Sequence, residues 1–263
     1  MMNKRTRVGL TAGLVLGAAV LVGVQDSGVI AGSGDSGRTP TITDADAVAR
    51  VREASRSQAE LKVTGTVGSP VSRAYVVSGR GVDGIVDVST GELGMLALSD
   101  NAPDSTTVSI SPDQAVAAAS EFLSAHAIPS PKVAPGVVLN DHSSTAEFVV
   151  SWVQRVNGIV VPDQMFVKVN PSSGAVFSVV RIHRPFNEPG AAKVSKAEAD
   201  AAARREFGGA DATLARAEVA ITFDNATGAQ RVAWRLEYKV KDAAGAFFGQ
   251  LVSVDATTGE VLP

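Results

Sequence analysis

Cysteine is absent from the 263 residues, aromatic residues make up only 5% of the chain, and charged residues make up 19%. The missing thiols exclude disulfide bonds, thiolate metal ligands and cysteine nucleophiles. The low charge, together with 45% hydrophobic residues, excludes an intrinsically disordered chain. We therefore expect a folded body, long enough for two or three compact units.

Basic charge is also scarce. The formal net charge is -3, from 24 basic and 27 acidic residues. Removing the N-terminal Lys4, Arg5 and Arg7 leaves 21 basic against 27 acidic residues, a net charge near -6. Proteins that bind phosphate backbones are basic, so no nucleic-acid partner is expected.

The N-terminus has the layout of an export signal. Three cations precede the apolar run Val8–Val24, and this order is typical of a secretory leader. The length of the run lies between those of a signal peptide and a membrane span. Residues 1–24 are therefore predicted to be a signal peptide or a signal anchor, with residues 8–24 as a membrane tether. Residues 25–40 are a predicted flexible linker, and the body is expected outside the cytoplasm, extracellular or in the cell envelope.

The body repeats a turn motif, [Asp/Asn]-x-x-[Ser/Thr]-Gly-x-[Leu/Val], which starts at Asp87, Asn170 and Asp255. Asp or Asn opens such a turn by accepting hydrogen bonds from the following backbone, and Gly supplies a positive φ. The neighbouring apolar stretches predict β-hairpins. For the acidic residues of these turns, a structural role is favoured over paired-carboxylate catalysis.

A second repeated motif, [Ser/Thr]-x-x-[Asp/Glu/Gln]-Ala, starts at Thr43, Ser111 and Ser195. The last two copies are capping boxes that begin helices. The distance from cap to turn is 44, 59 and 60 residues, so we expect the first copy to have lost a hairpin. The motifs predict an α+β protein of tandem units, each with one helix followed by antiparallel strands. The predicted units are a degenerate first repeat at 41–108, a second repeat at 109–186 and a third at 192–263.

Several segments resemble the PepSY and related propeptide domains of secreted thermolysin-like metalloproteases. Ser195–Ala203 resembles the helix opening of PepSY, Trp234–Val240 and Val252–Leu262 resemble its closing strands, and Phe148–Val180 resembles the companion propeptide motif. The resemblance implies a cystatin-like architecture, with each helix packed on a curved antiparallel β-sheet. It also implies a protein that inhibits or chaperones a protease. Since no catalytic module follows in this sequence, we expect a non-enzyme whose partner is an exported, thermolysin-like metalloprotease on another chain.

Strand addition to a sheet edge is the expected mode of partner binding. The expected contacts lie in the edge strand Phe247–Val254 and the loop Gln154–Pro162, and the residues are Gln154, Asn157, Gly158, Phe247 and Phe248. Two alternatives stay open. One is a structural or interaction module of the cell envelope without a protease target, and the other is an enzyme whose site is assembled from separate copies.

No cofactor or metal is expected. None of His126, His142 and His183 has metal-binding spacing, although the fold could bring His142 and His183 together. Gly79–Gly84 matches G-x-G-x-x-G, but a dinucleotide site needs a helix directly after it. A glycine-rich hairpin is therefore predicted there.

Two further features have alternative interpretations. Trp152 and Trp234 occupy comparable predicted strands, and core positions are favoured over a platform for stacking a ligand. Asn225-Ala-Thr227 is a glycosylation sequon and also a turn sequence, and the turn is preferred.

Overall fold

The computed structural model describes residues 42–69, 72–141, 144–207, 211–224, 227–241 and 247–262. The predicted leader at 1–24 and linker at 25–40 lie outside these residues, as do His142 and Asn225. Within the described ranges, no helix is both long and apolar enough to cross a membrane.

Three α-helices begin where the repeated cap motif predicts. In each, the Ser or Thr side chain accepts from the backbone three residues on, and the side chain there bonds back to the cap backbone. The first copy is a capping box as well, because Asp46 fills the position of Gln114 and Glu198. The helices are α2 (Asp44–Ser55), α3 (Pro112–Ala125) and α4 (Lys196–Arg204).

The eleven strands found among the described residues belong to one sheet. They are β1 (Lys62–Ser69), β2 (Ser72–Gly79), β3 (Val82–Asp87), β4 (Leu93–Leu98), β5 (Gly136–Asp141), β6 (Ala146–Val156), β7 (Ile159–Val169), β8 (Val176–His183), β9 (Ala212–Phe223), β10 (Gln230–Lys241) and β11 (Phe247–Asp255). Two short 3-10 turns follow β4 (Ser99–Asn101) and α4 (Arg205–Phe207). The predicted α+β class is therefore confirmed.

The first repeat contains strands that the sequence did not predict. The sequence pattern predicts strands here at Val71–Ser78 and Gly84–Val88, so β1 and β4 were missed. Three strands, β1 to β3, lie between the helix and the Asp87 turn. The expectation that this copy had lost a hairpin is therefore wrong. The cap-to-turn distance is short because β1, β2 and β3 have only 8, 8 and 6 residues.

The sheet is mixed rather than purely antiparallel, which corrects the prediction. Its main path runs β1-β2-β3-β4-β8-β7-β9-β10-β11, and β5 and β6 lie off it, with β6 paired to β7. β7 begins at Ile159, before its pairing with β8 starts at Asp163. Because this early part of β7 lies beyond the end of β8, Val160 meets Ala220 of β9 in a parallel pair.

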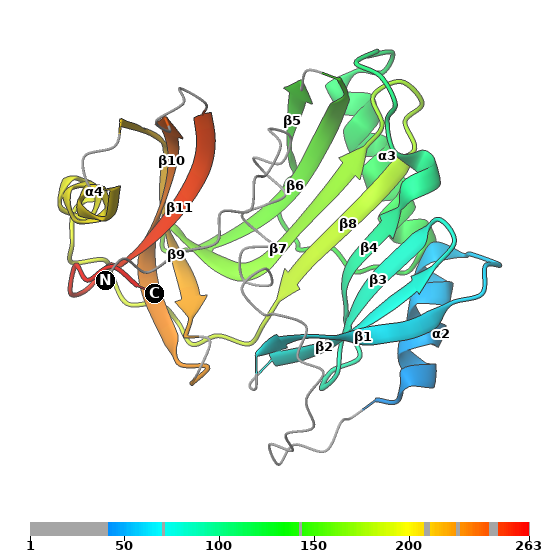
Figure 1. Cartoon of the computed structure of the whole chain (residues 1–263), viewed down its shortest axis with the longest axis horizontal. Coiled ribbons are helices and arrows are strands. Elements are labelled where there is room, and N and C mark those ends of the chain that lie inside the picture. Colours follow the sequence, from blue (N-terminus) through cyan, green and yellow to red (C-terminus); the bar gives the residue numbers. More distant parts are fainter. Residues whose placement is uncertain are drawn as a thin grey trace, which may run out of the picture.

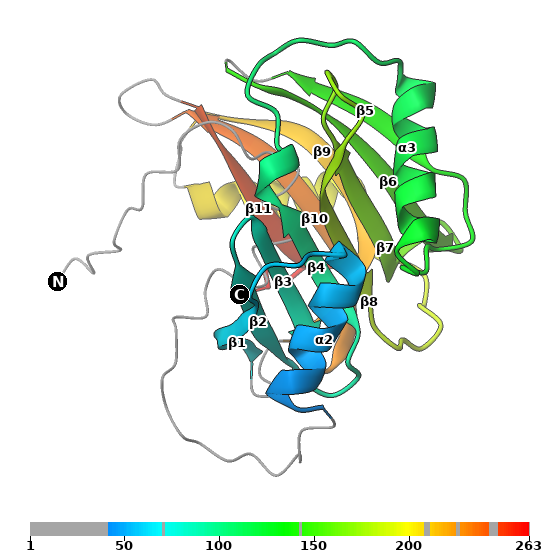
Figure 2. The ribbon, with the colours of Figure 1, turned by 90° about the vertical axis from the view of Figure 1, so that its right-hand side faces the viewer.

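The helices lie on the outside of the bent sheet, at its two ends (Figure 1). Figure 1 shows α4 outside β9–β11 at one end of the molecule and α2 and α3 outside the remaining strands at the other. Figure 2 shows α2 and α3 on the same face, one beyond the other. The helix-free faces of the two halves consequently turn inward (Figure 1).

Three clusters of buried side chains follow this layout. The first lies beneath both α2 and α3 and includes Val51, Leu123 and Trp152. The second lies beneath α4 around Leu236 and Tyr238. A small third cluster of Ile159, Val161 and Ile221 fills the junction between β7 and β9. The predicted units 41–108 and 109–186 thus share one core, and β4 pairs with β8 across their boundary.

The three turns have the same hydrogen-bond geometry. In the first, Asp87 Oδ1 accepts from the N–H groups of Ser89 and Thr90 at 2.8 Å, and Gly91 N–H donates to the Asp87 carbonyl at 2.9 Å. Asn170 and Asp255 make the corresponding bonds, and the glycines have φ of 71°, 77° and 79°. A fourth such turn closes the β9–β10 hairpin at Asp224, whose Oδ1 accepts from Thr227 N–H at 2.7 Å.

Each of the three repeated turns also contacts the residue before a helix cap. A methyl group on Gly91 would lie 3.2 Å from Ile42, and one on Gly259 would lie 3.8 Å from Val194. The Ala256 carbonyl accepts from Lys193 and Val194 N–H at 2.8 and 2.9 Å, and the Pro171 carbonyl accepts from Ser109 and Ile110 in the same way. We call this contact the turn–helix clasp. It joins the start of each helix to the turn motif that follows that helix in the sequence.

A buried tyrosine ties α4 to β10. Tyr238 is fully buried, and its hydroxyl donates to Asp200 Oδ1 at 2.6 Å. Arg204 pairs with the same carboxylate at 3.0 Å. Burial raises the pKa of Asp200, but the hydrogen bonds from Tyr238 and Arg204 and the charge of Arg204 outweigh it and leave the pKa below 3.8. The folded state therefore favours the ionised carboxylate.

We expect Tyr238→Phe to lower the free energy of unfolding by about 1.5–3 kcal/mol at pH 7, because a buried bond to a charged acceptor is lost. The pKa of Asp200 is depressed on folding, so this stabilisation is complete above the unfolded pKa and is lost as pH falls through the folded value. Denaturant unfolding at pH 7 and pH 3 should show the gap between wild type and variant shrinking in acid. An equal gap at both pH values would contradict this account.

Candidate functional site

The first predicted contact segment is a tight hairpin rather than a loop. Only Asn157 and Gly158 lie between β6 and β7, and both have positive φ, 53° and 79°. Two central residues with positive φ are typical of a type I′ turn, for which Asn-Gly is the favoured sequence. The residues that follow, up to Pro162, are buried in β7. The exposed residues of this segment are therefore Arg155 and the tip, Asn157 and Gly158.

Polar side chains hold this tip in place. Arg155 Nη1 donates to the Gly158 carbonyl at 3.1 Å, and its Nη2 donates to Glu218 Oε2 on β9 at 3.3 Å. Asn157 Nδ2 donates to Glu188 Oε1 at 3.3 Å. Arg155 therefore ties the hairpin to the C-terminal strands, next to the junction cluster of Ile159, Val161 and Ile221.

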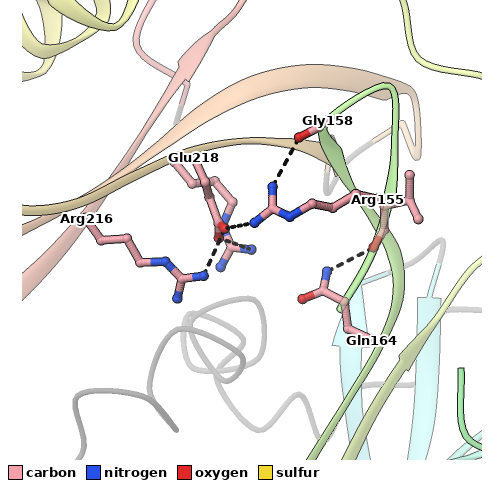
Figure 3. A network of polar contacts seen from close by, with 7 residues as sticks. Arg155, Gly158, Gln164, Arg216 and Glu218 are labelled. Atoms are coloured by element: carbon pink, nitrogen blue, oxygen red, sulfur yellow. Dashed lines mark hydrogen bonds and ion pairs between the residues drawn. The ribbon is translucent and has the colours of Figure 1, made fainter. Parts of the chain in front are cut away.

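Glu218 lies at the centre of an arginine cluster, drawn in Figure 3. Besides Arg155, Arg216 pairs with Glu218 at 2.9 Å and Arg235 approaches it to 3.9 Å. The Glu218 side chain is 13% exposed, whereas those of Arg155 and Arg216 are 45% and 48% exposed. Burial lowers the pKa of Arg235, and the charge of Glu218 opposes this. Three cations thus share one largely buried carboxylate.

A bulge in β7 explains a buried glutamine beside this cluster. The β6–β7 register shifts between Val153 and Arg155, opposite Pro162. Proline has no N–H for the ladder and is tolerated in sheets at such irregularities. Gln164 is 7% exposed and donates from Nε2 to the Val161 carbonyl at 3.1 Å (Figure 3). Its amide therefore satisfies a backbone acceptor that the bulge leaves outside the ladder.

The second predicted contact segment is the edge strand β11. It stands last in the sheet order and pairs along its length with β10. Phe248 is 46% exposed, and the side chain of Phe247 is outside the described set. Near the other end of the strand, Val261 forms a bridge with Val254, and Leu262 N–H donates to the Ser253 carbonyl at 2.8 Å. This edge therefore already accepts one short antiparallel segment.

The structure does not bring the two predicted contact sets together. Phe248 pairs with Val240 near the end of β10, whereas the hairpin meets Glu218, whose β10 partner is Arg235. Gln154 lies apart from both, in a pocket on the helix-covered face. The clustering of Arg155, Arg216 and Arg235 around Glu218 was missed, because it depends on the pairing of strands that are far apart in sequence.

His126, His183 and the two tryptophans each contact other groups of the protein. His126 Nδ1 lies 2.6 Å from the Ala54 carbonyl, and burial lowers the pKa of its ring. His183 lies 3.3 Å from Asp163. Trp152 is buried in the first core cluster, and Trp234 packs on the second and donates to the Val194 carbonyl at 2.8 Å. Among the residues that the structure describes, no group of three acidic or histidine side chains could hold a metal ion.

The G-x-G-x-x-G segment is a hairpin. Gly79 ends β2 and Val82 begins β3, and these two residues pair with each other. Since a strand follows instead of a helix, no N-terminal amides are available there for a pyrophosphate. This confirms the predicted glycine-rich hairpin.

The chain was compared with protein-family models, curated proteins and solved structures. No family model matches the chain, and no curated protein matches it. Among solved structures, the chain is similar to the C-terminal domain of Bacillus megaterium YpeB, with 15% sequence identity and a TM-score of 0.38. The match covers 85% of this chain and 96% of that domain. At that TM-score the likeness carries no argument about function.

We expect Glu218→Gln to lower the free energy of unfolding by about 1–3 kcal/mol, because three guanidinium groups lose their shared counter-charge. Added salt should reduce this loss by screening the repulsion between the arginines. Urea unfolding at low and high ionic strength measures both effects. The control is Glu188→Gln, whose exposed carboxylate accepts from Asn157 alone and should change stability by under about 0.5 kcal/mol. Equal stability of Glu218→Gln and wild type would contradict the assigned role of Glu218.

Proposed function

We propose that this chain is an exported, non-catalytic, PepSY-like protein that binds and regulates a secreted protease. The resemblance of Ser195–Ala203 and Val252–Leu262 to propeptide domains motivates the protease class, a thermolysin-like metalloprotease. In this proposal the chain makes the same contact with the protease whether it inhibits or chaperones it. The apolar run at 8–24 is the proposed signal or membrane tether.

The proposal includes the architecture. Three units of one capped helix and a curved antiparallel set of strands are repeated in tandem, each closed by its own turn–helix clasp. The repeated element order and the recurrence of the clasp support this interpretation. The shared core under α2 and α3 would then reflect fusion of the first two units through the β4–β8 pair.

The observation that carries the binding mode is the outer edge of β11. Ser253 directs its carbonyl outward to Leu262, and Asp255 directs its N–H outward to Glu260. In an antiparallel strand, outward-pointing residues alternate, so Leu251 and Gly249 also present their N–H and C=O groups outward. An extended segment of a protease would continue this pairing toward Phe248, with backbone bonds giving affinity.

Gly249 offers a sharp test of strand addition. A side chain at this position has nothing within 4 Å, so Gly249→Ala should leave binding unchanged. Gly249→Pro removes the outward N–H without taking a donor from the β10 ladder, and proline is tolerated on such edges. We expect it to weaken binding about tenfold, which is roughly the loss of one good hydrogen bond.

The measurement is titration of the purified full chain into a panel of thermolysin-like metalloproteases, with peptide cleavage and autolysis as readouts. Saturable inhibition or slowed autolysis is expected, retained by Gly249→Ala and weakened in Gly249→Pro. No effect on any protease would overturn the proposal and favour an envelope module without a protease target. Equal potency of both variants would reject the β11 edge as the contact.

A further inference from the structure

A pocket opens on the helix-covered side of the sheet, away from both β11 and the arginine cluster. It lies between the loop that follows α3 and the strands β6, β7 and β8, and its volume is about 330 Å³. Pockets that take small ligands fall in the range of about 300–1,000 Å³. The loop supplies Ser130 to Val133, and the strands supply polar side chains.

Arg181 of β8 is the most buried charge of this pocket. Its side chain is 13% exposed, and its Nε–H is fully buried without a hydrogen-bond partner among the described residues. Its Nη1 lies 3.6 Å from Glu92, whose side chain is 36% exposed. A buried donor without a partner costs about 1–3 kcal/mol. Arg181 therefore lines the pocket as a cation paired only loosely with Glu92, although its Nε atom is itself closed off from the pocket.

Other donors line the same pocket. The side chains of Ser130, Lys132 and Gln154 contact it, and within the described ranges none of the three makes a hydrogen bond or ion pair. The acidic residue on the pocket wall, Asp163, is engaged by His183 at 3.3 Å. The groups left over for a ligand are consequently cationic or neutral donors.

The remaining side chains that line the pocket are small and apolar. Pro131 and Val133 contribute the loop side. A ligand that suits this arrangement has an anionic head and a short apolar body. Arginine presents paired N–H groups that match the two oxygens of a carboxylate.

We propose that this pocket binds a carboxylate, with Arg181, Lys132 and Gln154 as its donors. The C-terminus of a peptide and a free small carboxylic acid share this chemistry. The site does not depend on strand addition at β11, so it can be tested separately from the proposed function.

The test uses the full chain labelled with 15N and follows the Nε–H resonance of Arg181. The probes are acetyl-Ala-Ala-Val with a free C-terminus, the same peptide as its C-terminal amide, and sodium acetate. Saturable shifts with the free peptide but not with the amide are expected. Saturation by acetate as well would assign the site to free carboxylic acids, and its absence would assign it to peptide C-termini. Equal shifts with the acid and the amide, or none with any probe, would overturn the proposal.

Matched variants separate binding from folding. Lys132 is exposed, so Lys132→Gln should fold normally and weaken peptide binding about fivefold to tenfold. Gln154→Glu places a negative charge beside the carboxylate and should weaken it further. Lys193→Gln, an exposed lysine outside the pocket, is the control and should bind as wild type. Wild-type affinity in both pocket variants would also overturn the proposal.

Discussion

The turn–helix clasp is the interaction on which the rest of the structure depends. At each copy of the turn motif, an Asp or Asn turn places a glycine against the apolar residue that precedes a helix cap. At the Asn170 and Asp255 copies, a turn carbonyl also accepts two N–H groups from that segment. Because this contact fixes where the helix begins relative to the last hairpin, it also determines which helix face covers the strands.

The clasp explains why two motifs separated by 44 to 60 residues recur as a pair. The capping box sets the first turn of the helix, and the hairpin turn holds the residue just before it. Glycine is required in the turn because its φ is positive at each copy. A side chain there would strain the backbone and, at Gly91, would also press on Ile42.

Features set by hydrogen bonds between neighbouring residues were predicted from the sequence, whereas features set by long-range strand pairing were not. The helix starts at Ser111 and Ser195 and the turns at Asp87, Asn170 and Asp255 follow from hydrogen bonds between near neighbours, so they were predicted. β1 was missed because Gly65 and Gly68 interrupt its alternation. The parallel pair of Val160 with Ala220 depends on the length of β7, which no local pattern gives.

The candidate surfaces also divide into those formed by neighbouring residues and those assembled from distant strands. Asn157 and Gly158 were predicted only as part of a loop, although Asn-Gly with two positive φ angles is a local signal for a tight hairpin turn. Glu218 and its arginines, and the pocket around Arg181, were missed because each is assembled from strands brought together by the sheet. The helix-free faces turn inward (Figure 1). The β11 edge and the Arg181 pocket, which we propose as contact sites, lie in separate parts of the sheet.

Native-state hydrogen exchange tests the clasp most directly. The amides of Ile110 and Val194 donate to the carbonyls of Pro171 and Ala256. If the clasp holds each helix start on its turn as firmly as the sheet is held, these amides should exchange with a free energy within about 1 kcal/mol of the central β10 amide of Leu236. Exchange from local openings several kcal/mol below that of β10 would contradict the account.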